Sequence, residues 1–204
     1  MNLELHTGRL RLTPLKADDV DLALEMYTDH EVLKHACGVM TEAEIHQEMP
    51  NWTKRGGNGG IGTWCIADQK TGEKLGETYL LPLPIEEYGT DFSLVVMGQM
   101  PDAAIEIGYF FKRSAWGQGY ATEVCRRVLR FAFEEVSLNE VVASVHDDNV
   151  ASKNVLEKAG LRHRGRTRCY GKDSPIYRIT RDEWIAMRPS TRSALAKLRS
   201  AAGQ

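Results

Sequence analysis

The chain has 204 residues, of which 42% are hydrophobic and 26% are charged, and its formal net charge is −2. This balance is typical of a folded globular protein and excludes a largely disordered chain. No apolar run approaches the roughly 18 residues of a membrane helix, and the start lacks the regions of a signal peptide. The 4 cysteines are scattered without a Cys-x-x-Cys pair, which argues against disulfides or a zinc site and favours the cytoplasm.

The charges are distributed unevenly along the chain. Residues 1–160 hold 15 Lys and Arg against 25 Asp and Glu, whereas residues 161–204 hold 11 against 3. A solvated basic face is the simplest interpretation, and a site for RNA, an acidic partner or a coenzyme phosphate is the alternative. On a strand, alternate residues share one face, which would apply here to Arg162, Arg164, Arg166 and Arg168.

The first quarter of the chain predicts one strand and two helices. Residues 9–14 alternate polar and apolar side chains, as an opening strand does. Asp18 and Asp19 precede an apolar stretch with helical spacing and are suited to the start of that helix. Thr41 and Glu44 form a capping-box pattern that begins a second helix.

The next segments predict a linker, a hairpin and an insertion. Residues 56–60 contain four glycines and are interpreted as a linker, because no strand leads into them as it would into a phosphate cradle. Residues 63–68 and 74–83 form a predicted hairpin. Residues 84–103, punctuated by proline and glycine, are expected to form a loop near a substrate entrance, with a strand or helical turn inside it.

The remaining segments alternate strand and helix and then end in a strand pair. The helical spacing of apolar residues is strongest in residues 117–136, and Gly160 is suited to the left-handed position after a helix. The predicted elements are a strand at 104–111, a helix at 117–136, a strand at 140–145, a helix at 149–159, strands at 161–168 and 176–180, and a short helix from Asp182. One domain at 1–189 and a basic tail at 190–204 are expected.

The most informative segment reads Trp-Gly-Gln-Gly-Tyr-Ala-Thr-Glu at residues 116–123. Glycines at the start of a helix let a ligand approach backbone N–H groups that have no partner inside the helix. Those groups and the positive end of the helix dipole favour phosphate or pyrophosphate. The segment therefore predicts a site for a phosphorylated ligand.

Three phosphate-binding designs compete for this segment. A Walker-type loop would need Gly-Lys-Ser/Thr, which does not follow Gly119. A dinucleotide fingerprint would need a third glycine where Thr122 stands, although Asp147 and Asp148 do end the next strand. The third design is the acetyl-coenzyme A loop, Gln/Arg-x-x-Gly-x-Gly/Ala, of the GNAT N-acetyltransferases, which the segment resembles with Trp116 in place of the first residue.

The flanking segments favour the GNAT resemblance. The segments 105–109 and 146–161 look like the family's neighbouring motifs at the expected distance, and the element order is similar over nearly the whole chain. The wording of residues 116–123, with Arg-Leu-Arg-Leu at 9–12, is most similar to the ribosomal-protein alanine and serine N-acetyltransferase branch (RimJ/RimL-like). The implied fold is a single α/β (α+β) domain with a mixed, mostly antiparallel sheet, flanked by helices and splayed to form a coenzyme cleft.

The resemblance also implies which residues bind acetyl-CoA. The strand residues would bond the pantetheine arm, and the loop amides would meet the pyrophosphate. The implied coenzyme-binding residues are Ile107, Gly108, Tyr109, Phe110, Phe111, Trp116, Gly117, Gln118, Gly119, Tyr120, Ala121, Thr122, Asn149 and Ser152. Because the thioester is already activated, no metal is required.

Three residues are candidates for the proton transfers. Glu106, an acidic residue in an apolar strand, is the first candidate for the general base that an ammonium substrate needs; it could also be a solvated carboxylate. His146 is the rival base, or a local cap. Ser152 matches the position whose hydroxyl protonates the leaving thiolate in the ribosomal-protein branch, and Asn149 could serve as a helix N-cap as well as a coenzyme contact.

The predicted activity is therefore transfer of an acetyl group to a primary amine, either a small amine or a peptide or protein N-terminus. Arginines on the strand at 161–168 would suit an acidic or ribosomal-protein acceptor. Neither a membrane nor a nucleic acid is an expected partner, and both a monomer and a homodimer are open. The alternatives are an inactive coenzyme A-binding sensor or interaction domain and, less favoured, a dinucleotide-binding oxidoreductase.

Overall fold

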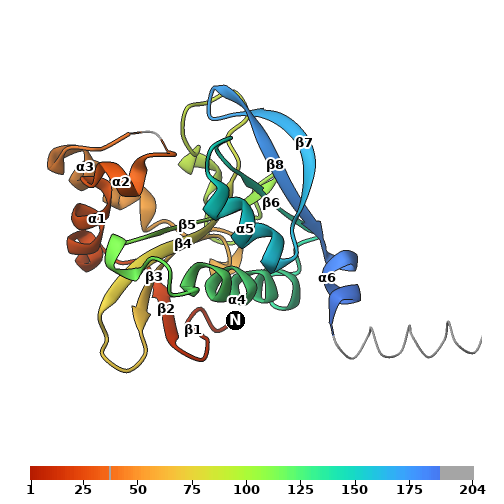
Figure 1. The fold of residues 1–204 in the computed structure, drawn as a ribbon, viewed down its shortest axis with the longest axis horizontal. Helices are drawn as coiled ribbons and strands as arrows, with labels where there is room; N and C mark the ends of the chain where they lie inside the picture. Colours follow the sequence, from red (N-terminus) through yellow and green to blue (C-terminus); the bar gives the residue numbers. More distant parts are fainter. Residues whose placement is uncertain (37, 189–204) are drawn as a thin grey trace, which may run out of the picture.

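The computed structural model describes residues 1–36 and 38–188, so the predicted tail at 190–204 lies outside the described residues. Within them, eight strands form one sheet in the order β1-β2-β3-β4-β5-β6-β8-β7 (Figure 1). The strands are β1 Leu5–His6, β2 Leu10–Pro14, β3 Gly62–Asp68, β4 Lys74–Pro82, β5 Ile105–Phe111, β6 Glu140–Ser144, β7 Arg162–Cys169 and β8 Lys172–Thr180. The α-helices are α1 Val20–Tyr27, α2 His30–Leu33, α3 Glu42–Trp52, α4 Tyr120–Glu134, α5 Val150–Ala159 and α6 Arg181–Met187.

The sheet is mixed and mostly antiparallel, as predicted. Neighbouring strands pair antiparallel throughout the described sheet except for β5 and β6, which are parallel. A doubly wound dinucleotide-binding domain has a mostly parallel sheet, so the topology removes the structural basis of the oxidoreductase alternative. None of the helices in the described residues is long and apolar enough to cross a membrane.

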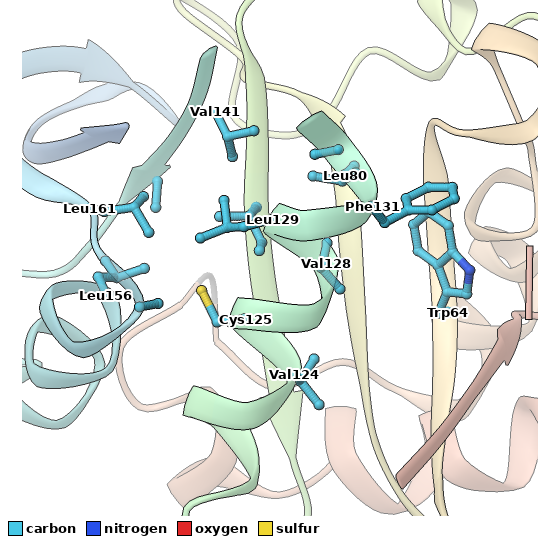
Figure 2. Close-up of a cluster of buried hydrophobic side chains, with 14 of the residues drawn as sticks. Trp64, Leu80, Val124, Cys125, Val128, Leu129, Phe131, Val141, Leu156 and Leu161 are labelled. Atoms are coloured by element: carbon cyan, nitrogen blue, oxygen red, sulfur yellow. The ribbon is translucent and has the colours of Figure 1, made fainter. Parts of the chain in front are cut away.

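Helices cover both faces of this sheet. On one face, α4 buries Val128, Leu129 and Phe131, and Phe131 packs edge-on against Trp64 of β3 at 5.5 Å between ring centroids (Figure 2). Leu156 of α5 lies in the same cluster. The helices α1, α2 and α3 form a second cluster on the opposite side, and Figure 1 shows them grouped apart from α4 and α5.

The helix after the glycine-rich segment begins later than expected. Its first residue is Tyr120 instead of residue 117, because Gly117 and Gly119 have φ of 72° and 78° and lie in the preceding loop. Glycine adopts this left-handed region without the steric cost that a Cβ imposes. Gly160, with φ of 111°, ends α5 as predicted.

The predicted hairpin of β3 and β4 is confirmed, and the insertion at 84–103 has little regular structure. It contains one 3-10 turn, Phe92–Leu94, which Asp91 caps by accepting a hydrogen bond from the Ser93 amide. The carbonyl of Gln99 accepts a hydrogen bond from the Gly57 amide at 2.9 Å. The glycine-rich linker therefore anchors the insertion.

The prediction that four arginines share one face of β7 is wrong. The register shifts between His163 and Arg166, where Gly165 has φ of 93°. As a result Arg162 pairs with Arg178 whereas Arg166 pairs with Pro175, and positions 175 and 178 point to opposite faces of β8. The arginines also have acidic partners: Arg164 pairs with Glu183, Arg166 with Asp147 and Asp173, and Arg168 with Glu86.

Candidate active site

A cleft opens where β5 and β6 separate. Their ladder contains a single residue pair, Glu106 and Val142, and beyond it the two strands diverge. The opening belongs to a cavity of about 1850 Å³. Pockets for one drug-sized ligand are roughly 300–1,000 Å³, so this cavity has room for two substrates side by side.

The loop before α4 presents free amides to this cavity. Within the described part of the chain, none of the amides of residues 117–122 has a hydrogen-bond acceptor, and no side chain caps α4. A Cβ built on Gly117 would meet nothing within 4 Å, so the loop is open on that side. These amides and the helix dipole attract an anion.

Arg9 holds the loop from the outside. Its guanidinium donates to the Gln118 carbonyl at 2.9 Å, forms an ion pair with Glu123 at 2.6 Å and lies 4.5 Å from the centre of the Tyr120 ring. Arg9 is thus bound to the first turn of α4 and to the loop at the same time. The hydrogen bond from Arg9, the residue before β2, to Gln118 joins this strand to the anion-binding loop, although 109 positions separate the two residues.

Most of the residues predicted to bind coenzyme line the cavity together. Gln118 is the exception, since it presents its carbonyl to Arg9. The lining residues from the predicted set are Ile107, Gly108, Tyr109, Phe110, Phe111, Trp116, Gly117, Gly119, Tyr120, Ala121, Thr122, Asn149 and Ser152. Trp116, in the position of the family's polar residue, is 47% exposed and donates its indole N–H to the Phe111 carbonyl at 2.9 Å.

Glu106 is buried, at 3% exposure, at the point where the sheet divides. Its Oε1 accepts hydrogen bonds from the amide and the hydroxyl of Ser144, both at 2.8 Å, and its Oε2 accepts one from the Tyr170 hydroxyl. Burial raises the pKa of Glu106, and the hydrogen bonds from Tyr170 and Ser144 oppose that rise. The carboxylate joins β5, β6 and the β7–β8 turn, so the solvated-carboxylate alternative is wrong.

Ser152 and Asn149 lie at the start of α5, facing β5. The Asn149 side chain accepts a hydrogen bond from the Ser152 amide at 3.0 Å, which is the N-cap arrangement. The Ser152 hydroxyl lies 2.9 Å from the hydroxyl of Tyr109, whose pKa burial raises. A hydrogen-bonded hydroxyl pair therefore spans the gap between β5 and α5.

His146 lies at the cavity rim, just after β6. Its Nδ1 accepts a hydrogen bond from the Asp148 amide at 3.2 Å, and its ring centroid lies 5.2 Å from that of His35. Burial, and next His146, lowers the pKa of His35. The contact between the two imidazoles brings the segment after α2 and the segment after β6 together at the cavity.

Glu77, which the sequence interpretation missed, also lines the cavity. It is 3% exposed in the middle of β4, where Tyr27 of α1 donates a hydrogen bond to it, and burial raises its pKa to about 7. The available signal was the one that identified Glu106: a glutamate within an otherwise apolar strand pattern. Residues 74–83 carry that signal, although their pattern by itself predicts only a hairpin strand.

Comparisons with known proteins agree with this architecture. The model of the acetyltransferase (GNAT) domain family matches residues 9–162. A protein of Aspergillus fumigatus, FsC-acetyl coenzyme A-N(2)-transacetylase, is 34% identical over 93% of this chain and 82% of its own length.

Solved structures agree as well. An acetyltransferase of the GNAT family from Bacillus anthracis superposes with a TM-score of 0.68 at 20% identity, covering 88% of this chain and 99% of its own. An aminoglycoside acetyltransferase in complex with coenzyme A superposes with a TM-score of 0.66 at 14% identity, covering 88% and 99%; this shows a shared fold. With the divided sheet, these matches place the chain in the GNAT family of acetyltransferases.

Proposed function

We propose that the protein is an N-acetyltransferase that moves an acetyl group from acetyl-CoA to a primary amine by direct attack in a ternary complex. The observation that carries this proposal is the cleft between β5 and β6 with the acceptor-free amides of residues 117–122 at its end. A long thioester with a diphosphate fits that combination: exposed strand edge for the pantetheine amides, and a helix N-terminus for the phosphates.

The segments of the chain would have the following roles in binding and reaction. Amides of residues 117–122 bind the pyrophosphate, and the edge of β5 at 107–111 orients the pantetheine arm. The bound thioester supplies an activated acyl carbon. The amine nitrogen forms a bond to that carbon while the carbon–sulfur bond breaks, and the nitrogen loses a proton.

Three side chains are proposed for the proton transfers and the geometry around them. The Ser152 hydroxyl, hydrogen-bonded to Tyr109, would donate a proton to the departing sulfur. Glu106 accepts three hydrogen bonds, so it is better suited to fixing the divergence of the strands than to binding a free ammonium. Of these three side chains, His146 at the rim is left as a candidate for taking a proton from the amine.

The acceptor is proposed to be a small amine or a peptide N-terminus. Three of the four arginines of β7 are engaged by acidic partners and Arg162 donates to backbone carbonyls, so they lend no support to an acidic or ribosomal-protein acceptor. The acetyltransferases that match this chain are of different kinds. Both a small amine and a peptide N-terminus therefore stay within the proposal.

A two-part experiment tests the proposed function. Coenzyme A should raise the melting temperature, and a thiol-release assay over amines and peptide N-termini should show turnover that depends on an acceptor. Binding without turnover on any acceptor would favour a coenzyme A sensor. Absence of binding would overturn the proposal.

A further inference from the structure

Glu77 occupies a face of the sheet that points toward α1, α2 and α3. It lies opposite Phe110 of β5 and Cys65 of β3 in the strand register. Cys65 and Phe110 both contact the cluster of α1, α2 and α3. Because directly opposite residues share a face of a sheet, the Glu77 carboxylate points to the same side, where it lines the cavity.

This carboxylate has no countercharge in the described part of the chain. No Lys, Arg or His forms an ion pair with it there, and Tyr27 supplies its hydrogen bond. An ionised carboxylate can accept about four hydrogen bonds, and burial of an unpaired one is costly. Glu106 differs, because Ser144 and Tyr170 supply three donors.

Aromatic rings surround the cavity side of Glu77. The Tyr27 ring stacks on Trp52 of α3 with centroids 4.7 Å apart and is tilted against Phe110 at 5.7 Å. All three rings line the cavity. The faces of such rings attract ammonium groups, and their bodies exclude water from an apolar stem.

We propose that Glu77, Tyr27, Trp52 and Phe110 form the acceptor site, which takes a primary alkyl- or arylalkylammonium with its nitrogen on the carboxylate and its stem against the rings. This inference rests on the proposed function of the same cleft. The ammonium gives one proton to Glu77, which takes the role of proton acceptor instead of His146. The freed nitrogen bonds to the acyl carbon as the carbon–sulfur bond breaks, its second proton passes to the departing sulfur by way of the Ser152 hydroxyl, and Glu77 returns its proton to solvent.

The surroundings of Glu77 suit this exchange. The titratable groups that face it are the Tyr27 phenol from α1 and the Cys65 thiol from β3, whose pKa burial raises to about 12. Neither a phenol nor a thiol can carry a positive charge, so the cation of the substrate would be the compensating charge. The raised pKa of Glu77, about 7, lets it both take up and release a proton near neutral pH.

The test is an equilibrium titration of alkyl- and arylalkylamines, each with its matched alcohol, in the presence and absence of coenzyme A. The wild type should bind at least one amine about tenfold or more tightly than its alcohol. Glu77→Gln keeps the shape and an acceptor for Tyr27, and should remove most of this preference. Trp52→Leu should weaken the amine and the alcohol alike, because both stems lose the ring.

Glu25→Gln is the matched control, since Glu25 lies on α1 but pairs with Lys112 at 2.9 Å and is 56% exposed. It removes one negative charge and should leave the amine preference unchanged. Coenzyme A affinity, which Glu77→Gln should preserve, shows that the variant is folded. If Glu77→Gln does not fold, the ratio of amine affinity to alcohol affinity, measured in the wild type and in Trp52→Leu, still tests the proposed acceptor site.

Equal binding of amines and alcohols by the wild type, no binding of any amine, or an unchanged preference in Glu77→Gln would overturn the inference. Each of these results, together with coenzyme A binding and acceptor-dependent turnover, leaves the proposed function standing. Failure of coenzyme A to bind at all would instead remove the proposed function.

Discussion

The Tyr170 phenol donates a hydrogen bond to the Glu106 carboxylate, although 64 positions separate the two residues. Tyr170 and Gly171 form the two-residue turn between β7 and β8, and Tyr170 has φ of 52°, a left-handed conformation that costs a residue with a Cβ. The turn thus holds Tyr170 in a conformation that brings its side chain to the point where β5 and β6 diverge.

Tyr170→Phe should lower the free energy of unfolding by about 1–3 kcal/mol, because Glu106 remains buried with one donor fewer. The measurement is chemical denaturation. Tyr88→Phe is the matched control, since Tyr88 is 82% exposed, and it should change stability by less than about 0.5 kcal/mol. Equal effects of the two substitutions would show that the Tyr170 contact with Glu106 does not stabilise the fold.

Glu77 should make the protein less stable as the pH rises toward 7. Burial raises its pKa from 4.5 to about 7, so between these values the folded state holds a proton that the unfolded state has lost. The stabilisation is fully present below pH 4.5 and decreases through pH 7, with a slope of at most about 1.4 kcal/mol per pH unit. Unfolding curves from pH 4.5 to 7.5 measure this decrease in the free energy of unfolding. The decrease should be smaller in Glu77→Gln than in the wild type. An identical pH dependence in both proteins would contradict the assignment.

Gly117→Ala should weaken coenzyme A binding and cost stability. Its φ of 72° strains an alanine by about 1–3 kcal/mol, although a Cβ there meets nothing within 4 Å. Gly72→Ala is a close control, because Gly72 has φ of 75°, equally open surroundings and a place in the β3–β4 turn. Both variants should lose stability in denaturation, and only Gly117→Ala should lose affinity in a coenzyme A titration. A similar affinity loss in both would exclude a specific role for the loop.

Ser152→Ala should lower kcat by about a hundredfold if its hydroxyl protonates the departing thiolate. Its amide contact with Asn149 is retained, because that hydrogen bond uses the backbone. Tyr109→Phe removes the partner hydroxyl, 2.9 Å away, and the double variant should lose less than the sum of the two single losses in free energy. The measurement is steady-state kinetics of the wild type and the three variants with one and the same amine acceptor. An unchanged kcat in Ser152→Ala would assign Ser152 to binding alone.

Much of the fold could be predicted from local patterns. The alternation of residues 9–14 in β2, the hairpin of β3 and β4, the capping box of Thr41 and Glu44, and Gly160 after α5 each depend on neighbours a few positions away, and the structure contains all of them. The sequence predicts a start of α4 at residue 117, before the observed start at Tyr120, because a glycine pattern indicates backbone freedom and does not specify which conformation is adopted. The position of Tyr120 as first helical residue depends on φ at Gly119.

The candidate site was only partly predictable. The loop at residues 116–122 could be identified because its motif is contiguous, whereas Glu77 became part of the cavity through contact with Tyr27, 50 positions earlier. The four arginines of β7 show the opposite error. Their alternation suggested one basic face, but a bulge at Gly165 changed the direction of the side chains, and four acidic neighbours, three of them from other segments of the chain, balance the charge.

The sequence by itself determined the order of the strands and helices apart from the short β1 and α2, the glycine loop that exposes amides before α4, and the resemblance to the GNAT family. Only the tertiary structure decided that β5 and β6 part after Glu106, that Glu106 accepts three hydrogen bonds, and that Glu77 is a buried carboxylate beside aromatic rings. The physical reason is the distance along the chain over which each effect acts. Propensities and caps act over a few residues, whereas burial and charge pairing depend on which distant segments the sheet brings together.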